Sequence, residues 1–181
     1  MRLRVGRPVQ EPGSDRSSPA PPAPPSRGLD RGDLIRAKRP AMGSYFEICL
    51  GANVPGAVDL ADRALNVVDA LETQLSIYRD DSEVSRLNAS AHEGPVVVEE
   101  GLFDLLRRAV EISRSTAGAY DVTSGALSEA WGFIRGPRRV PDDETLASAR
   151  SRTGWHHLKL DPDRRTVAFD RPGIAINLGS I

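Results

Sequence analysis

The sequence has few cysteines and no long hydrophobic run, two features that identify common classes of small protein. Its 181 residues include one cysteine, Cys49, which excludes an internal disulfide, and the apolar neighbours of that thiol favour a buried position on a strand. It has no long hydrophobic run, which argues against a transmembrane segment. The first 40 residues hold neither the apolar core of a signal peptide nor a lipid-accepting cysteine, so we expect a cytoplasmic protein.

An excess of charge of one sign is also lacking, because the net charge is −1. The basic residues are almost all arginines and are scattered along the chain, so we expect no nucleic-acid partner. The chain lacks a phosphate-binding P-loop, a paired-glycine dinucleotide fingerprint, a His-Glu-x-x-His motif and a Gly-x-Ser-x-Gly motif. The common nucleotide-binding and hydrolase classes are therefore not supported.

The N-terminal region differs in composition from the rest. Residues 1–40 carry nine basic residues against four acidic ones, and residues 19–25 read Pro-Ala-Pro-Pro-Ala-Pro-Pro. Such a segment lacks backbone donors and favours an extended, unpacked chain. We therefore predict a disordered Pro/Arg-rich tail over residues 1–34 and one folded domain over residues 35–181.

Hydrophobic periodicity in the predicted domain indicates strands on either side of a run of helices. Apolar spacings of three and four, together with capping residues, predict helices over residues 57–77, 82–88, 102–118, 125–133 and 142–153. Stretches of β-prone residues predict strands over residues 44–50, 96–98, 155–160, 165–170 and 174–178. This arrangement indicates the α+β class, with a mixed or antiparallel sheet and packed helices.

The most informative motif is Gly118-Ala119-Tyr120-Asp121-Val122-Thr123, which is followed by Trp131-Gly132-Phe133. It places a small-residue turn, an aromatic ring, a carboxylate and a hydroxyl side by side between two helices. An acidic residue between Tyr120 and Val122 is costly to bury without partners, which favours a ligand role for Asp121 over a structural cap. The adjacent His156 and His157 are predicted to point to opposite faces of a strand, and we assign them no role.

Three further segments stand in a fixed order around this motif. They are Ala41-Met42-Gly43-Ser44, the run from Leu75 to Asn88, and Ile176-Asn177-Leu178-Gly179-Ser180-Ile181. The series resembles the FAD:protein FMN transferases, the ApbE-type flavin transferase family. In that family the last segment continues into Gly-Lys-Gly-Tyr, so the resemblance implies the N-terminal portion of the domain, truncated at the C-terminus.

The resemblance also implies roles for individual residues. Those that match flavin-contacting positions are Met42, Tyr78, Ala119, Tyr120, Asp121 and Asn177. The main-chain carbonyl of Ser180 matches one Mg²⁺ ligand, and the family supplies the remaining ligands far downstream. These residue types suit their roles, since a thioether and planar rings pack against a flat ring system and a hard cation prefers oxygen ligands.

The implied activity is the Mg²⁺-dependent transfer of FMN from FAD to a Thr or Ser of a partner flavoprotein, with release of AMP. FAD is then a substrate, Mg²⁺ is a cofactor, and the partner is an acceptor flavoprotein with a Ser/Thr flavinylation motif. Two alternatives to this enzyme stay open. The chain could be a truncated and catalytically inert flavin-binding protein, or a fragment without an independent stable fold.

Overall fold

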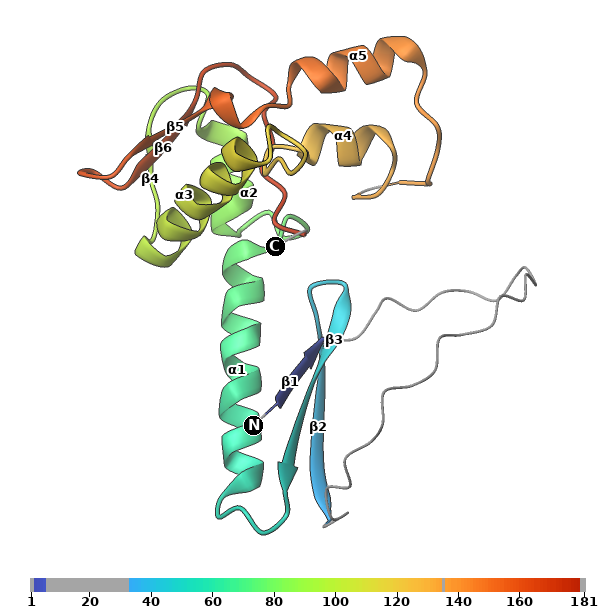
Figure 1. The fold of residues 1–181 in the computed structure, drawn as a ribbon, viewed down its shortest axis with the longest axis vertical. Coiled ribbons are helices and arrows are strands. Elements are labelled where there is room, and N and C mark those ends of the chain that lie inside the picture. The colour runs from blue at the N-terminus through green and yellow to red at the C-terminus, as the bar shows by residue number, and fades with distance from the viewer. Residues whose placement is uncertain (1, 6–32, 135, 180–181) are drawn as a thin grey trace. The chain divides into compact units, whose positions relative to one another are not determined.

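The structure is a computed structural model that describes residues 2–5, 33–134 and 136–179. Close packing divides the chain into two units, Met1–Glu72 and Thr73–Ile181 (Figure 1). Helices and antiparallel strands both occur, which confirms the predicted α+β class. Among the helices of the described ranges, none combines the length and apolar character needed to cross a membrane.

The first unit is built on a three-stranded antiparallel sheet in the order β1-β3-β2. Its strands are β1 (Arg2–Val5), β2 (Leu34–Ala41) and β3 (Ser44–Gly51). β3 is central and corresponds to the strand predicted for residues 44–50. β2 lies at the edge of the sheet, and this position explains how it accommodates Pro40, because an edge strand does not need every backbone donor.

Helix α1 (Ala57–Leu75) begins in this unit and supplies one side of its core. The core consists of the buried apolar residues Ile48, Leu50, Ala57, Ala61 and Leu65. The predicted helix is confirmed, but Val58 and Leu71 of the predicted apolar stripe are 64% and 41% exposed. The buried line of α1 starts at Ala57, one residue before the predicted line, and continues through Ala61, Leu65 and Val68 at spacings of four, four and three.

The described part of the second unit contains α2 (Glu83–Ser90), α3 (Glu100–Ser115), α4 (Gly125–Ala130) and α5 (Asp143–Ser151). A small antiparallel sheet has the order β4-β6-β5, formed by β4 (Val96–Val97), β6 (Thr166–Phe169) and β5 (Leu158–Asp161). Ser82 caps α2, because its Oγ accepts a hydrogen bond from the Ser85 N–H at 2.9 Å. The predicted start of this helix is therefore confirmed.

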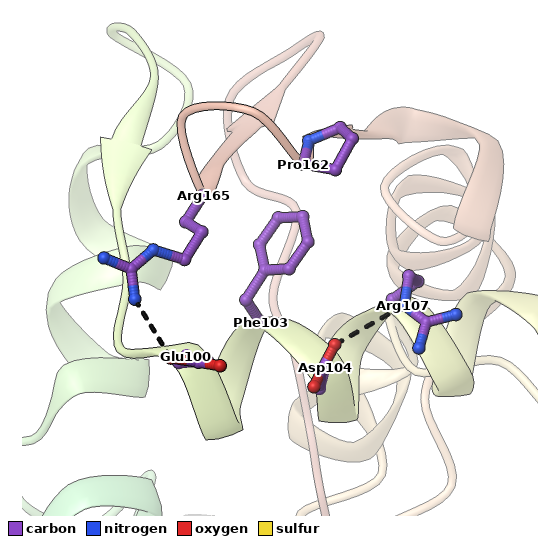
Figure 2. Close-up of a pocket in the computed structure, with 6 residues that line it drawn as sticks. All are labelled: Glu100, Phe103, Asp104, Arg107, Pro162 and Arg165. Atoms are coloured by element: carbon purple, nitrogen blue, oxygen red, sulfur yellow. Dashed lines mark ion pairs between the residues drawn. The ribbon is translucent and has the colours of Figure 1, made fainter.

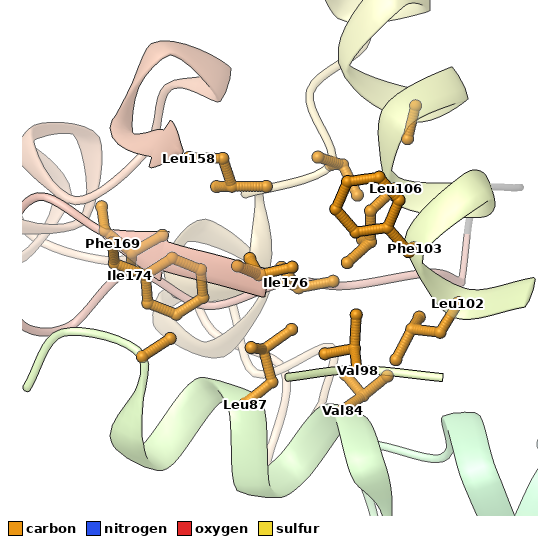
Figure 3. Close-up of a cluster of buried hydrophobic side chains, with 14 residues drawn as sticks. Val84, Leu87, Val98, Leu102, Phe103, Leu106, Leu158, Phe169, Ile174 and Ile176 are labelled. Atoms are coloured by element: carbon orange, nitrogen blue, oxygen red, sulfur yellow. The ribbon is translucent and has the colours of Figure 1, made fainter. Parts of the chain in front are cut away.

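The core of the second unit joins two helices to the small sheet and to the segment that follows it (Figure 3). Its buried members include Val84, Leu87, Val98, Leu102, Phe103, Leu106, Val122, Leu158, Val167, Phe169, Ile174 and Ile176. A smaller cluster of Ala126, Ala130 and Ala149 holds α4 against α5. Small side chains at this contact let the two short helices approach closely.

Several predicted elements differ from the structure. Residues 2–5 form β1 and residue 34 begins β2, so the predicted disordered tail is wrong at these positions, and residues 6–32 of that tail lie outside the described residues. β1 is fixed by pairing with β3, a partner more than 40 positions away in sequence that local composition does not reveal. Cys49 is only half-buried, with its Sγ 3.7 Å from Nη1 of Arg36.

The predicted strand over residues 174–178 is reduced to one parallel bridge between Ser124 and Ala175. The Asn88 side chain takes the place of a partner strand here. Its Nδ2 donates to the carbonyl of Ile176 at 3.1 Å, and its Oδ1 accepts from the N–H of the same residue at 2.8 Å. The predicted strand over residues 155–160 is also shorter, because Trp155–His157 form a 3₁₀ turn before β5.

Candidate functional site

The signature motif begins where α3 ends. Ala117 and Gly118 both have positive φ, 51° and 81°, and the Gly118 N–H donates to the carbonyl of Ser113 at 2.8 Å. This left-handed turn stops the helix, as predicted from Gly118. It leaves Ala119 exposed and Tyr120 half-buried at the edge of the second core.

The carboxylate of Asp121 is held on both of its oxygens. Oδ1 accepts hydrogen bonds from the N–H of Thr123 at 2.9 Å and from the Thr123 hydroxyl at 2.6 Å. Oδ2 accepts from the N–H of Trp155 at 2.9 Å. Asp121 therefore fixes its own turn and attaches that turn to a segment 34 positions further along the chain.

Thr123 completes this attachment from inside the protein. Its side chain is fully buried, and its Oγ1 accepts a hydrogen bond from the buried N–H of Gly154 at 2.7 Å while donating to Asp121. The Thr123 hydroxyl therefore links the Asp121 carboxylate to the buried backbone of Gly154.

The segment Ile174–Gly179 lies against the other side of the motif. The Asn177 N–H donates to the carbonyl of Val122 at 2.9 Å, and the Gly125 N–H donates to the carbonyl of Ala175 at 3.1 Å. The Asn177 side chain donates from Nδ2 to Ser128 Oγ at 3.1 Å and accepts at Oδ1 from the Gly179 N–H at 2.9 Å. Two motifs more than 50 positions apart in sequence therefore meet through their backbones.

The structure thus brings together Tyr120, Asp121 and Asn177, three of the residues predicted to contact a flavin. Tyr78 belongs to the same unit and is 57% exposed, so its ring is available to a ligand. Met42 belongs to the first unit, at the tip of the β2–β3 hairpin. Ser180, the predicted Mg²⁺ contact, lies outside the described residues.

The described residues do not form a metal site by themselves. Within residues 33–134 and 136–179, no three side chains of His, Cys, Asp or Glu group closely enough to hold an ion. These residues therefore do not fit a resident Mg²⁺ ion without further ligands. We assign no catalytic step to a metal held by them.

Two residues that shape the site were not predicted, Gly154 as a donor to Thr123 and Trp155 as a donor to Asp121. Asn88 ends one of the quoted segments, but its bonds to the backbone of Ile176 were not predicted. The Asp-x-Thr spacing of residues 121 and 123 is typical of side chains that bond to nearby backbone. This spacing was the one local signal that pointed to a structural network.

A hollow of about 480 Å³ lies elsewhere in the second unit, between the start of α3 and the turn that joins β5 to β6 (Figure 2). Its lining residues are Glu100, Phe103, Asp104, Arg107, Pro162 and Arg165. Its charged side chains pair with one another, Arg165 with Glu100 and Arg107 with Asp104, each at 3.5 Å. The hollow shares no residue with the motifs, and we give it no part in flavin binding.

His157 is buried and pairs with Asp170, with 2.9 Å between its Nδ1 and Oδ1 of the carboxylate. His156 is exposed, and the two rings belong to a 3₁₀ turn rather than to a strand, so the predicted strand geometry is wrong. The hydrogen bond with His157 lowers the pKa of Asp170 below its ordinary value of 3.8, and Arg171 adds to the effect. The pair fixes the segment that donates to Asp121 and Thr123, since the His157 N–H also donates to the carbonyl of Gly154.

We expect this pair to make stability depend on pH in the acidic range. Because the pKa of Asp170 is lower in the folded state, its contribution is complete above the unfolded-state pKa and is lost as pH falls through the folded-state pKa. Asp170→Asn should therefore melt below the wild type at pH 7, and the two melting curves should converge below about pH 3. Thermal unfolding followed by circular dichroism across this range checks the prediction, and a constant difference at every pH would contradict it.

Comparison with known proteins points to one family. A sequence model of the ApbE family matches residues 42–181. A FAD:protein FMN transferase of Klebsiella pneumoniae (strain 342) is 29% identical over 170 residues, which are 91% of this chain and 46% of the relative. One from Vibrio cholerae is 33% identical over 156 residues, 82% of this chain and 45% of the relative.

Solved structures give the same result. The ApbE protein of Thermotoga maritima superposes on this chain with a TM-score of 0.75 at 26% sequence identity. The match covers 81% of this chain and 48% of the Thermotoga chain. The flavin transferase ApbE of Vibrio cholerae gives a TM-score of 0.72 at 29% identity, with 82% and 49% covered. The chain spans about half the length of the curated relatives it matches. Since the family match extends from the Met42 turn through the signature motif to the segment that contains Asn177, the chain belongs to the ApbE family.

Proposed function

We propose that this chain supplies the FAD-binding residues of an FAD:protein FMN transferase. The enzyme transfers FMN from FAD to a Thr or Ser hydroxyl of an acceptor flavoprotein, releases AMP and requires Mg²⁺. The flavin-contacting residues in this proposal are Met42, Tyr78, Ala119, Tyr120, Asp121 and Asn177. The Mg²⁺ requirement rests on the family resemblance, and no described residue is assigned to the ion.

The observation that supports the proposal most strongly is the junction between the signature motif and the segment Ile174–Gly179. The hydrogen bond from the Asn177 N–H to the carbonyl of Val122 holds the segment that carries Asn177 beside the motif that carries the exposed Ala119 and the half-buried Tyr120. A rigid frame that presents an aromatic ring, a carboxylate and an amide suits a ligand with a planar ring and several polar groups.

The proposed reaction exchanges one phosphorus–oxygen bond for another. The acceptor hydroxyl oxygen bonds to the phosphorus of the FMN half of FAD, and the bond from that phosphorus to the bridging oxygen breaks. AMP leaves with the bridging oxygen, and the hydroxyl proton is released to solvent. Such a transfer depends mainly on positioning and on charge stabilisation, so the role of this chain's residues is to bind and orient the flavin half of FAD.

Tyr78 offers the cleanest test of FAD binding because its side chain is exposed. Tyr78→Ala should leave thermal stability nearly unchanged, as is usual for exposed positions. Stacking of an aromatic ring on a planar base contributes about 1–3 kcal/mol, so FAD affinity should fall about 5- to 150-fold. Titration of FAD, followed by flavin fluorescence, measures the change. Val97→Ala, at another exposed apolar position, is the control and should bind FAD as the wild type does.

The transfer activity needs a separate experiment. The protein made from its complete reading frame is incubated with FAD, Mg²⁺ and an acceptor flavoprotein that bears the Ser/Thr motif, with and without EDTA. We expect covalent in-gel flavin fluorescence on the acceptor, AMP in solution, and neither product with EDTA. FAD binding without labelling of the acceptor would contradict the transferase and support the alternative, an inert flavin-binding protein. Absence of FAD binding would contradict both.

A further inference from the structure

The Met42 turn has an unusual backbone conformation for the residues that occupy it. β2 and β3 are joined by two residues, because Ala41 pairs with Ser44. Met42 has a φ of 54° and Gly43 a φ of 70°. Positive φ at both central residues marks a type I′ turn, which strongly favours Asn-Gly or Gly-Gly. A methionine at the first position is disfavoured sterically, and its side chain is 44% exposed, so core packing does not explain the choice.

One side chain of α1 holds this turn. The ladder between the strands ends at the pair Ala41–Ser44, which leaves the N–H of Met42 without a partner on the opposite strand. Oε1 of Glu72 accepts a hydrogen bond from this N–H at 2.8 Å. A carboxylate that accepts from a backbone N–H makes a charge-assisted bond, which is stronger than a neutral one.

A second contact fixes the hairpin beside this bond. The guanidinium of Arg39 on β2 donates from Nη1 to Asp69 Oδ2 at 2.6 Å and to Asn66 Oδ1 at 2.7 Å, and from Nη2 to Asp62 Oδ1 at 2.8 Å. Its three acceptors are spaced by four and three residues and therefore lie on one face of α1. Glu72 follows Asp69 by three residues and extends that face by one turn, to the Met42 backbone.

We infer that Glu72 is a positioning residue that holds the Met42 turn in its left-handed conformation and so sets where the Met42 thioether meets FAD. The inference rests on the proposed function for the contact between Met42 and FAD. Backbone strain of this kind persists when the surrounding structure imposes it. Here Arg39 aligns the hairpin with α1, and Glu72 supplies the bond at the strained residue.

The two methionines of the chain, Met1 and Met42, allow a direct test. Protein labelled with [¹³C-methyl]methionine gives two methyl signals, and Met42→Leu assigns the one from Met42. In Glu72→Ala without ligand, we expect the Met42 signal to move toward its position in unfolded protein, because the turn is released. Glu72→Gln keeps an oxygen that can accept the N–H and should keep the wild-type signal. Asp59→Ala, which removes another carboxylate from α1, should also keep it.

FAD is then added to each protein. For the wild type we expect the Met42 signal to shift while the Met1 signal does not. The affinity for FAD should fall at least tenfold in Glu72→Ala and stay within about threefold of wild type in Glu72→Gln. An unchanged Met42 signal in Glu72→Ala without ligand overturns the positioning role, whatever FAD does. A wild type that binds no FAD overturns the proposed function, and the comparison without ligand still decides whether Glu72 holds the turn.

Discussion

Gly125→Ala is expected to lower the free energy of unfolding by about 3 kcal/mol, the upper part of the usual range for an overpacked core. A Cβ at residue 125 would lie 2.6 Å from the carbonyl oxygen of Ala175 and 2.7 Å from the Ala175 Cβ. The first of these atoms belongs to the backbone, and the second is a Cβ, which no side-chain rotation can move. The clash is therefore removed only if the segment Ile174–Gly179 moves away from the signature motif.

The loss should appear as a melting temperature about 6–12 °C below that of the wild type, given the usual scaling for a chain of this size. The FAD affinity should fall as well, since Asn177 is carried on the displaced segment. Gly94→Ala is the matched control, because nothing lies within 4 Å of its Cβ position and its φ is not positive. If Gly125→Ala and Gly94→Ala melt together, the close approach of the two segments does not exist in solution.

The elements whose signals are local could be predicted from the sequence. The long helices α1 and α3 were predicted from their apolar periodicity, and the start of α2 was predicted from its capping residues. β1 and β2 were missed because their pairing with β3, rather than their own composition, stabilises them. β2 carries charged residues along much of its length, which made it resemble the preceding basic segment.

The candidate site shows the same contrast between local signals and long-range contacts. The signature motif was singled out from its residue types alone, whereas the distant partners of its residues lie 31 to 55 positions away. No local pattern indicates that Gly154 and Trp155 fold back to Asp121 and Thr123, or that Asn88 replaces a strand beside Ile176. These contacts depend on how β5, β6 and the following segment pack on α2 and α3, which is a property of the whole unit.

The other large effect is expected at Thr123, where a single hydroxyl joins two segments. Thr123→Val keeps the shape of the side chain but removes the donor to Asp121 and the acceptor for the Gly154 N–H. A buried donor without a partner costs about 1–3 kcal/mol, and a lost bond to a carboxylate costs a similar amount, so we expect about 3 kcal/mol in total. Val adds no volume, so this loss comes from polar groups rather than from packing.

The conservative variant separates the hydroxyl from the methyl group. Thr123→Ser retains both hydrogen bonds and loses one buried methyl, so it should cost only about 1 kcal/mol. Hydrogen exchange of the Gly154 and Trp155 amides, followed by NMR, should accelerate in Thr123→Val and stay near wild-type rates in Thr123→Ser, because only the first variant releases that segment. Weaker FAD binding in Thr123→Val with normal binding in Thr123→Ser would connect the buried network to the flavin-contacting residues. Equal exchange rates in the two variants would mean that the hydroxyl does not hold the motif, and that Asp121 alone attaches it through Trp155.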